Sequence, residues 1–487
     1  MPALDKYSNI VRSHGFLFDK SSGASSTVNA AAAKDQANLT VAGASSFANG
    51  QDIVVGSGET TELCRILSGG GTTSLVMTKN LKYDHPVGDL VTEQAAFQLG
   101  TAEADGIKFN IDGETTDVFG VMSRLLYNKV PGFVSFKGSM RMPTPTVDIL
   151  AVACGVQRSE VIGDGTAAQQ TGTVGPRQFW SDGSNFNTLK RGCFFATIQT
   201  IDGSWRTFYA FNCAFNPTAM SVQFARGVVA NVPFNWVMSG YAIDFTNSQF
   251  VPSTTVLTYD ATKQDMIAEV VGVDYGVAGT ATTITAQATA GAYQITVAST
   301  TGMAAGSIVK LGSGDQAEYH EVHAIVSLVA QLRTQVKRTW ASGSAAAPIT
   351  LTTFSGLSVG GATYSVSGTA TERKTETQRA VQDYLLQNIT PKWTFALSSL
   401  TPENHYLSVG APSSDYASSV LTFRNAAKNT GLEVVVMRFL ALNGKSVKAI
   451  LWQPVVEVSQ ETVLSQAVES QLPVSLLPAA QTWMINA

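Results

Sequence analysis

The side chains that could hold a metal ion lie closest together in the segment EYHEVH, where His320 and His323 are three residues apart. Imidazole and carboxylate groups are common ligands of Zn²⁺. Residues three apart share one face of a helix, but they point to opposite faces of a strand. The surrounding pattern is typical of a strand, and it is not the His-Glu-x-x-His arrangement of zinc enzymes. We therefore expect two strand residues here and no shared metal. The remaining histidines are isolated: His14, His85 and His405.

Three glycine-rich segments could in principle cradle a phosphate group: Gly56–Gly58, Gly69–Gly71 and Gly312–Gly314. A phosphate loop is completed by a Lys-Ser/Thr step and by the N-terminus of a helix, whose amides bind the anion. None of the three segments has this step, and each lies between runs that favour strands. The sequence therefore predicts turns at these glycines.

A nucleophile is equally hard to find. Cys154 closes an apolar segment with no histidine nearby, so we expect a buried core thiol. Cys193 and Cys213 would lie almost opposite each other on one hairpin, which makes a disulfide possible, but four cysteines suit free thiols better. No Gly-x-Ser-x-Gly nucleophile elbow or regularly placed carboxylate pair stands out. The sequence predicts no catalytic, cofactor-binding or metal-binding residues, and thus a protein that is not an enzyme.

Composition limits the remaining classes. The chain has 487 residues, of which 14% are charged, against about 25% in an ordinary globular domain. A net charge of -4 argues against tight binding to nucleic acid through phosphate contacts. So few charges indicate that other subunits cover much of the surface. No apolar run reaches the roughly 20 residues that a membrane helix needs, and the N-terminus does not look like a secretory signal.

The elements that would position any site follow one recurring pattern of strand, turn and short helix. It first appears in Pro131–Gly155, where Thr144 and Pro145 suit a helix start and Gly155 a helix end. It returns in Pro391–Gly410, with Thr401-Pro402 as the helix start and Trp393, Phe395 and Leu397 on one apolar face.

A second unit is also repeated. Leu39–Val41 matches Ile295–Val297, each residue 256 positions later (295 − 39), and Tyr83 is aligned with Trp340. Short strands punctuated by glycine predict a small β module at about 37–91 and another at about 292–349. Residues 21–36, SSGASSTVNAAAAKDQ, have the composition of a linker.

Further matches extend the repeat along the chain. Asp202-Gly203 and Asn443-Gly444 both indicate tight hairpin turns. Thr115–Tyr127 and Thr371–Gln387 are expected to be strands. Val156–Lys190 has no counterpart of equal length and is rich in glycine and serine, so we expect an exposed loop there.

The predicted fold class is mainly β (α+β), with two tandem β-sandwich or barrel units. The first half is 1–250 and the second is 251–487. Each half has one short helix and one small inserted β module. This duplication should be visible as two related cores placed side by side.

The strand–turn–helix of Phe133–Gly155, followed by a long hairpin at Phe194–Phe215, resembles the tail tube proteins of long-tailed bacteriophages. The segment WTFALSSLTPENHYLSVG carries the same resemblance in the second half. It implies tube-like β-sandwich units whose sheets join those of neighbours around a channel. This chain departs from the family in carrying the unit twice, with an inserted module in each copy.

The resemblance implies a structural virion protein: a major tail tube subunit. Three chains would form a homotrimeric, pseudo-hexameric ring, and stacked rings would form the channel for DNA ejection. Its partners would be further copies of the chain, tape measure, tail hub and terminator proteins, and double-stranded DNA held transiently without specific binding. Assembly would take place in the host cytoplasm, with no membrane and no cofactor.

Two alternatives stay open. A tail hub or distal ring protein would share the fold but cap the tube. A surface adhesin or carbohydrate-binding β protein would need exposed aromatic platforms, for which the candidates are Tyr83, Trp180 and Phe186.

Overall fold

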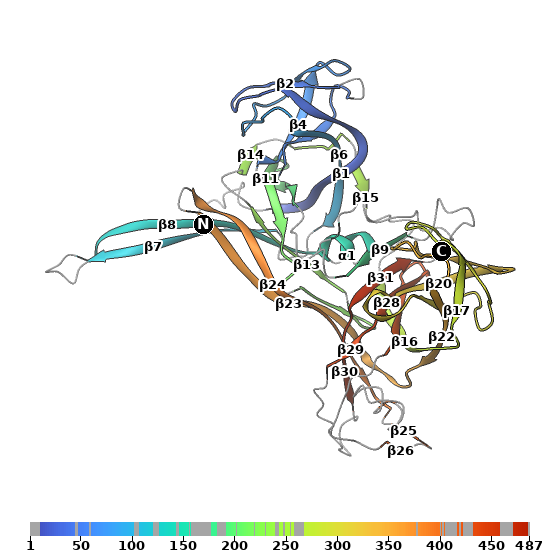
Figure 1. Ribbon diagram of the computed structural model, residues 1–487. Coiled ribbons are helices and arrows are strands. Elements are labelled where there is room, and N and C mark those ends of the chain that lie inside the picture. Colours follow the sequence, from blue (N-terminus) through green and yellow to red (C-terminus); the bar gives the residue numbers. More distant parts are fainter. Residues whose placement is uncertain are drawn as a thin grey trace.

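The computed structural model describes residues 10–43, 47–57, 60–101, 107–119, 126–142, 146–154, 156, 177–182, 191–200, 202–218, 220–228, 230–238, 243–246, 249–253, 255–257, 267–375, 378–399, 401, 404, 416–417, 420–421, 432–457 and 471–485. The chain is mainly β, as the sequence predicts, and α1 (Val147–Ala153) is the one α-helix named within these residues. Two small barrels lie at the periphery, and α1 lies between the larger sheets (Figure 1).

The first barrel closes through six strands, drawn in blue in Figure 1. Its strands are β1 (Ile10–Ala30, C-terminal part), β2 (Asn38–Val41), β3 (Asp52–Val55), β4 (Glu62–Ser68), β5 (Ser74–Met77) and β6 (Leu90–Thr101, N-terminal part). The order around the barrel is β1–β2–β5–β4–β3–β6 and back to β1. Closure leaves no unpaired sheet edge in the module.

Residues 21–30, predicted as part of a linker, therefore form a barrel strand. Small polar residues give this segment no alternating apolar pattern that would predict a strand. Val28 is nevertheless buried inside the barrel, where it pairs with Val41 of β2.

The second barrel has the same strand order. It consists of β17 (Thr282–Ala286), β18 (Gln294–Val297), β19 (Ile308–Leu311), β20 (Glu318–Val326), β21 (Val329–Leu332) and β22 (Ala345–Thr353), with a short 3₁₀ turn, η4 (Gly314–Gln316), between β19 and β20. The order is β17–β18–β21–β20–β19–β22 and back to β17.

The two barrels also agree residue by residue in register. Val28 pairs with Val41, and Ile284 pairs with Val297; both positions differ by 256 (284 − 28; 297 − 41). An irregularity follows at the same place in both strands. The matched registers extend to the isolated bridges Ala32↔His85 and Ala288↔Trp340. Trp340 thus takes the place of His85, and the sequence alignment of Trp340 with Tyr83 is wrong by two residues.

The larger N-terminal strands form two further layers. One layer is β6–β1–β10–β11–β14, with β10 (Arg191–Thr200), β11 (Trp205–Phe215) and β14 (Ile243–Thr246). The other is β13–β8–β7, with β13 (Val232–Met238), β8 (Leu126–Met142) and β7 (Lys108–Phe119). A short strand, β15 (Thr255–Leu257), lies parallel to β6.

The C-terminal strands are arranged in the same way. One layer is β22–β16–β27–β28–β31, with β16 (Ile267–Ala278), β27 (Val434–Ala441), β28 (Ser446–Trp452) and β31 (Ala480–Ile485). The other is β29–β30–β24–β23, with β29 (Val455–Val456), β30 (Leu472–Leu477), β24 (Gln378–Leu397) and β23 (Leu357–Thr375). A separate small hairpin joins β25 (Tyr416–Ala417) to β26 (Val420–Leu421). The strands expected in Thr115–Tyr127 and Thr371–Gln387 are confirmed where the chain is described.

The hairpins that the sequence placed at Asp202-Gly203 and Asn443-Gly444 are confirmed. Gln199 pairs with Trp205 in the first, and Leu440 pairs with Ser446 in the second, so both partners differ by 241 (440 − 199; 446 − 205). Gly203 and Gly444 have φ values of 84° and 82°, a conformation that glycine adopts without steric cost.

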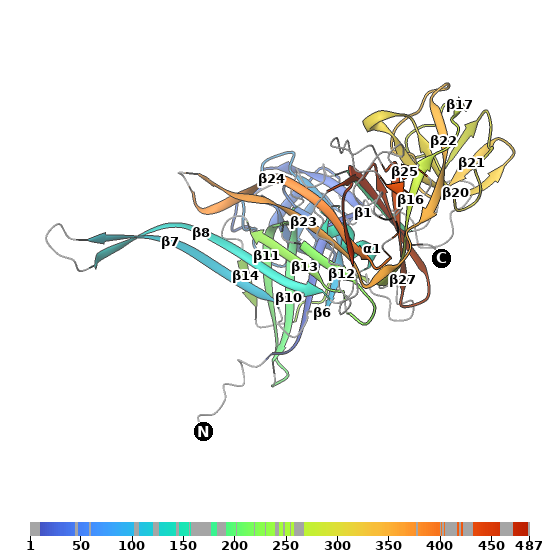
Figure 2. The ribbon, with the colours of Figure 1, turned by 90° about the horizontal axis from the view of Figure 1, so that it is seen from below.

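Two strands of the N-terminal half extend the sheets of the C-terminal half. Strand β12 (Met220–Phe224) pairs along five residues with β23, and β9 (Arg177–Ser181) pairs along five residues with β31. The prediction that Val156–Lys190 is an exposed loop is therefore wrong for β9, where Phe179 is buried. The long hairpins β7–β8 and β23–β24 also meet, at the parallel bridge of Val134 with Ala380, and project together on one side (Figure 2).

Helix α1 lies between the two halves. It contacts β13 of the first half and β31 of the second, and all of its residues are buried. The Oγ1 of Thr146 accepts a hydrogen bond from the N–H of Ile149 at 3.3 Å, so the helix cap is Thr146 and not Thr144 as predicted. In the second half, Thr401 Oγ1 accepts from the N–H of Asn404 at 3.1 Å, 255 residues later (401 − 146). The rest of the second predicted helix lies outside the described residues.

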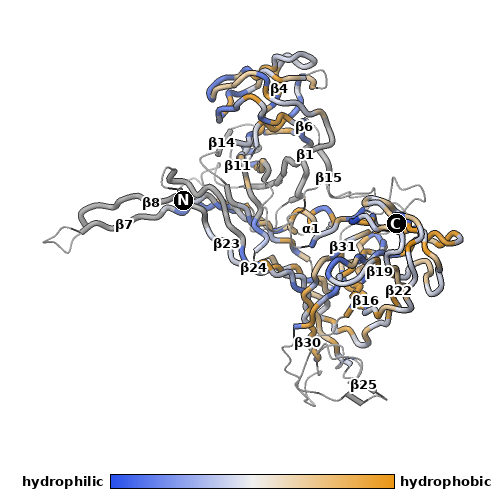
Figure 3. Tube along the Cα trace, viewed as in Figure 1, coloured by the Kyte–Doolittle hydropathy of each residue, from blue (hydrophilic) through white to orange (hydrophobic). Residues whose placement is uncertain are grey.

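One continuous core joins the halves. It includes Trp236 and Phe224 from the first half and Trp393, Phe439 and Trp483 from the second. Phe224 lies 5.1 Å from Phe439 between ring centroids, and Trp393 lies 5.4 Å from Trp483. Apolar segments follow α1 and the strands around it (Figure 3). The apolar face predicted for Trp393, Phe395 and Leu397 is confirmed, since all three are buried.

We predict that Phe224→Ala lowers the free energy of unfolding of the whole chain by about 3–5 kcal/mol, because a fully buried phenyl ring leaves a cavity in the shared core. Val228→Ala is the control, since Val228 is 45% exposed. Urea unfolding followed by tryptophan fluorescence would show one transition at lower urea. A transition that splits, with its later phase unchanged, would contradict a shared core.

We also predict unequal costs for two glycines of the second barrel. Gly306 and Gly312 have φ values of 84° and 75°, but a Cβ at Gly312 would lie 2.1 Å from Trp340, whereas Gly306 has nothing within 4 Å. Gly306→Ala should cost about 1–2 kcal/mol for backbone strain alone. Gly312→Ala should cost about 1–3 kcal/mol more, because the indole must move. If both substitutions lowered the free energy of unfolding equally in denaturant titrations, the contact with Trp340 would not contribute to stability.

Candidate functional site

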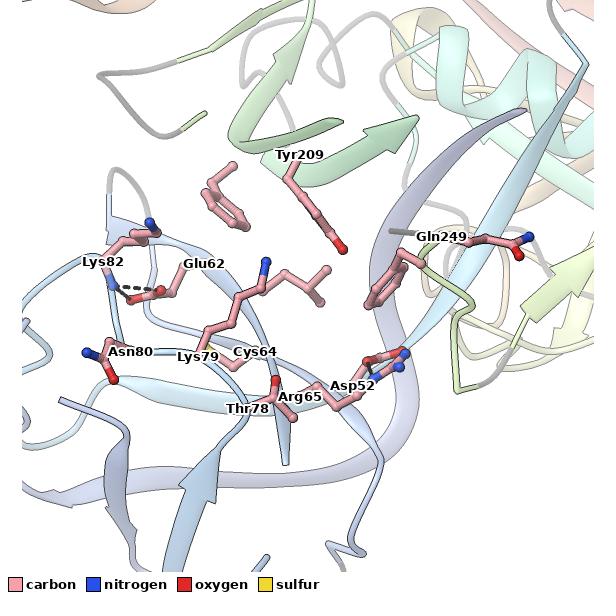
Figure 4. A pocket seen from close by; sticks show the side chains of 13 residues that line it. Asp52, Glu62, Cys64, Arg65, Thr78, Lys79, Asn80, Lys82, Tyr209 and Gln249 are labelled. Carbon is pink, nitrogen blue, oxygen red and sulfur yellow. Dashed lines mark hydrogen bonds and ion pairs between the residues drawn. The ribbon is translucent and has the colours of Figure 1, made fainter. Parts of the chain in front are cut away.

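A pocket lies between the first barrel and the N-terminal sheet (Figure 4). Its volume is about 250 Å³. It is lined by residues of β3, β4, β11, the segment after β5 and the segment after β14: Asp52, Glu62, Leu63, Cys64, Arg65, Thr78, Lys79, Asn80, Lys82, Tyr209, Phe211, Gln249 and Phe250. The alternation of β4 turns Glu62 and Cys64 inward, with Leu63 and Arg65 half-buried toward the sheet.

One side of the pocket is held by an ion pair. Arg65 Nε donates to the buried carboxylate of Asp52 at 2.7 Å. The same carboxylate accepts from the N–H and the hydroxyl of Ser253, at 2.8 and 3.0 Å. The Arg65 guanidinium also lies 4.4 Å from the ring centre of Phe250. These contacts tie the segment after β14 to the barrel.

The opposite side rests on a buried carboxylate, Glu62. It accepts hydrogen bonds from the backbone N–H groups of Lys82 (2.9 Å) and Tyr83 (3.2 Å), and its Oε1 lies 2.8 Å from His85 Nε2. The other ring nitrogen of His85 lies 2.9 Å from Asp89. Burial lowers the pKa of His85, but the hydrogen bonds and charges of Glu62 and Asp89 outweigh it, so the pKa is raised overall.

Aromatic rings form the floor. Tyr209 and Phe211 lie on β11, with ring centroids 6.3 Å apart, and the ammonium of Lys79 lies 4.6 Å from the Tyr209 ring centre. Figure 4 shows Lys79 and Tyr209 facing each other across the pocket. Rings combined with ammonium groups suit an aromatic or amphipathic guest.

The thiol and the two carboxylates of the pocket differ in their surroundings. Burial, with smaller contributions from Glu62 and Cys193, raises the pKa of the Cys64 thiol well above its usual value, so the thiol stays neutral and weakly nucleophilic. Glu62 and Asp52 are each occupied by the hydrogen bonds described above.

His320 and His323, the candidate metal ligands in the sequence, have different surroundings in the structure. His320 is buried and bonded to Thr334 (2.7 Å) and Glu318 (3.0 Å), whereas His323 is only half-buried. Burial, then the charge of Arg333, lowers the pKa of His323 against the opposing effect of Glu321. No group of three or more His, Cys, Asp or Glu residues suited to a metal ion is found in the part of the chain that the structure describes.

The other candidates are structural. Cys154 closes α1, and burial raises its pKa to about 12, against the smaller effect of its contact with Tyr364. All four cysteines are free and buried, as predicted. The described glycines of the three glycine-rich segments include five with positive φ, which confirms turns there: Gly56, Gly69, Gly71, Gly312 and Gly314.

The aromatic residues considered for a carbohydrate platform are packed. Trp180 packs against the apolar cluster between the second barrel and its sheet, which includes Trp452. Tyr83 packs against the corresponding cluster of the first half, which includes Tyr209 and Phe211. Phe186 lies outside the described residues.

Sequence reasoning did not find the pocket. Its lining residues come from five separate segments of the sequence. The one feature of the sequence that could have pointed to Glu62 is the match between the two barrel segments, in which Glu62 and Glu318 are aligned, 256 residues apart (318 − 62). Glu318 Oε2 likewise accepts from the N–H of Lys337 at 2.7 Å.

A scan against protein-family models gives no match, and a search of the curated proteins gives none either. No helix among the described residues is both long and apolar enough to cross a membrane.

We predict a pH dependence that arises from His85. Its folded pKa is raised above the unfolded value of about 6.5, so the protonated ring stabilises the folded chain. This contribution is fully present below about pH 6.5 and is lost as the pH rises through the folded pKa. The difference in melting temperature between wild type and His85→Gln should therefore decrease as the pH rises from about 6.5 through the folded pKa of His85.

His323→Gln is the matched control, because its pKa is lowered and its contribution has the opposite sign: wild type loses stability relative to this variant as the pH falls. Thermal unfolding between pH 5.5 and 8.5 measures both differences. A wild-type difference from His85→Gln that does not change with pH would contradict the role given to Glu62 and Asp89.

Proposed function

We propose that this chain is a structural subunit of a bacteriophage tail tube. Three copies form a ring of pseudo-six-fold symmetry, and stacked rings enclose the channel through which DNA leaves the virion. The chain has no catalytic role in this proposal.

Matching geometry in the two halves supports the underlying tandem duplication. The barrels share strand order and register, and the β10–β11 and β27–β28 hairpins share register and turn. The strand that pairs with the first strand of each hairpin carries a register irregularity at the same place. In β1 it lies between Ile10 and Arg12, opposite Thr200, and in β16 it lies between Ile267 and Glu269, opposite Ala441. Repeated irregularities of this kind are specific features of a fold, not general properties of β proteins.

The observation that carries the proposal is the sharing of strands between halves. Strands β12 and β9 of the first half extend β23 and β31 of the second. The corresponding edge strands of the first half are β7 and β14. Within the described residues, β7 pairs only with β8, and β14 pairs only with β11.

In the second half each of these sheet edges is extended by a strand of the first half, whereas the corresponding edges of the first half have no such strand within the described residues. This difference suggests that a strand of another copy pairs there, in a head-to-tail contact. A contact of this type forms a closed ring when its rotation divides a full turn, and a fibre when it does not. Two tube units per chain and six units per ring give three chains.

The charge of the chain is compatible with a DNA channel. A net charge of -4 gives weak repulsion of phosphate groups rather than attraction, so DNA could slide without sticking. The further partners in this proposal are tape measure, tail hub and terminator proteins, with assembly in the host cytoplasm and residence in the virion.

Negative-stain microscopy and mass photometry of the purified chain test this function. We expect particles of three chains, 51.5 kDa each, with a central pore, which stack into uniform tubes as concentration rises. Closed rings that never stack would instead indicate a hub or distal ring protein. A chain that remains monomeric, or forms open fibres without a pore, would overturn the proposal.

A further inference from the structure

A line of hydrogen bonds crosses the core of the C-terminal half at the end of α1. Trp393 Nε1 of β24 donates to Gln481 Oε1 of β31 at 3.2 Å, and Gln481 Nε2 donates to the hydroxyl of Tyr364 on β23 at 2.8 Å. That hydroxyl lies 3.5 Å from the Sγ of Cys154, the C-cap of α1. These four side chains, which we call the polar bridge, are at most 2% exposed. Bulk water therefore does not compete for their hydrogen bonds.

The donors and acceptors of the polar bridge fit together in one way. An indole N–H only donates, so Trp393 meets the oxygen of Gln481, and the amide nitrogen turns toward Tyr364. The tyrosine oxygen accepts this bond, which leaves its own proton to be donated to Cys154 Sγ. Burial, followed by the charge and hydrogen bond of Cys154, raises the pKa of Tyr364 well above its usual value, against the opposing effect of Gln481. The phenol therefore keeps its proton.

The matching positions of the N-terminal half hold residues that cannot form this bridge. Tyr364 pairs with Trp393 across β23 and β24. The pair 255 positions earlier, across β7 and β8, is Phe109 with Gly138 (364 − 109; 393 − 138). The indole comes from the next strand instead, where Trp236 pairs with Gly138. Its buried Nε1 has no hydrogen-bond partner among the described residues. The paired indole is thus a feature of the C-terminal half.

The polar bridge lies where elements of the two halves meet. Cys154 belongs to α1, which contacts β31 and β9. Gln481 pairs through its backbone with Ser181 of β9, and Tyr364 pairs with Val222 of β12. Each element that the N-terminal half places against the C-terminal sheets, α1, β9 and β12, therefore contains a bridge residue or pairs with one.

Apolar packing alone would hold α1 less specifically. Its seven residues, VDILAVA, are all buried, and six of them are apolar. Apolar burial depends on area and not on direction, so a helix that turns or slides would still bury similar groups. A buried polar group that loses its partner costs free energy. Such groups can therefore exclude arrangements that apolar contacts would accept.

We propose that the polar bridge fixes one position of α1 and one alignment of β31 against β23, and thereby selects the register in which the two halves join. A displaced α1 takes Cys154 away from Tyr364, and a displaced β31 separates Gln481 from both of its partners. Because β9 and β12 pair with β31 and β23, their places follow. This role concerns the single chain and does not depend on the proposed ring.

The first experiment removes the polar atoms and keeps the volume. The double variant Tyr364→Phe/Gln481→Met should unfold in urea with an equilibrium constant within about tenfold of wild type, because both partners become apolar. Tyr364→Phe alone should be less stable than the double variant, since it leaves the Gln481 amide nitrogen without its acceptor. Amide hydrogen exchange of residues 147–154 should nevertheless be at least about tenfold faster in the double variant, because α1 then has more than one position.

The matched control is Thr197→Val. It removes a buried polar atom from β10, where Thr197 Oγ1 lies 3.4 Å from Thr207 Oγ1, and it leaves the polar bridge intact. Exchange of residues 147–154 should stay at the wild-type rate. If the double variant also keeps the wild-type rate, apolar packing fixes α1 and the proposal is wrong. A faster exchange throughout the chain, in proportion to lost global stability, would likewise overturn it.

A second series approaches the bridge from the helix and decides the question if the double variant does not fold. Cys154→Ala should speed exchange of α1 by about three- to tenfold, the range of one hydrogen bond, whereas Cys154→Ser keeps a polar partner for Tyr364 and should not. In the Tyr364→Phe background, Cys154→Ala should have no further effect. Effects of Cys154→Ala that are equal in the two backgrounds would show that the thiol and the phenol are not coupled, and the proposal would fail.

Discussion

The structure depends above all on how the edges of its sheets obtain hydrogen-bond partners. A strand at an edge presents unpaired N–H and C=O groups that either bind water or recruit another strand. The small barrels solve this by closing, and the C-terminal half solves it by accepting β9 and β12 from the N-terminal half. Because these strands also deliver Phe179 and Phe224 into the interior, the two halves share one core and cannot exist as independent domains in the observed form.

The barrels show how one framework accepts different side chains. Glu62 and Glu318 both fix the segment after the fifth strand by accepting backbone N–H groups. A buried carboxylate needs such donors, since burial without them is costly. Each glutamate also has a histidine partner, but from different places: His85 lies across the barrel, whereas His320 lies two residues along the same strand. Trp340 fills the position of His85, and the facing Gly56 and Gly312 leave room for either ring.

Local signals in the sequence were enough for the mainly β class, the turns at Gly203 and Gly444, and the buried face of Trp393. They failed where a partner lies far along the chain. Strand β9 reads as a polar loop because its pairing strand, β31, is some 300 residues away, and nothing local shows that Phe179 will be buried. The first strand of the first barrel is hidden by serine and alanine, and its role follows only from its neighbours β2 and β6. The pocket could not be predicted for the same reason, since β11 and the segment after β5 meet only in the folded chain.

The direction in which strands are shared restricts how copies can associate. Strands β9 and β12 of the N-terminal half extend sheets of the C-terminal half, whereas among the described strands only the three-residue strand β15 pairs in the other direction, with β6. The edges that correspond to the two extended ones, β7 and β14, lie on the N-terminal half and gain no further strand within the described residues. A two-fold dimer would use each such contact reciprocally and would close at two chains. A head-to-tail arrangement places the C-terminal half of one copy beside the N-terminal half of the next, and so repeats at each junction the geometry already present inside the chain. The low charge of the chain, 14%, fits this view, because surfaces covered by successive copies need few solvated groups.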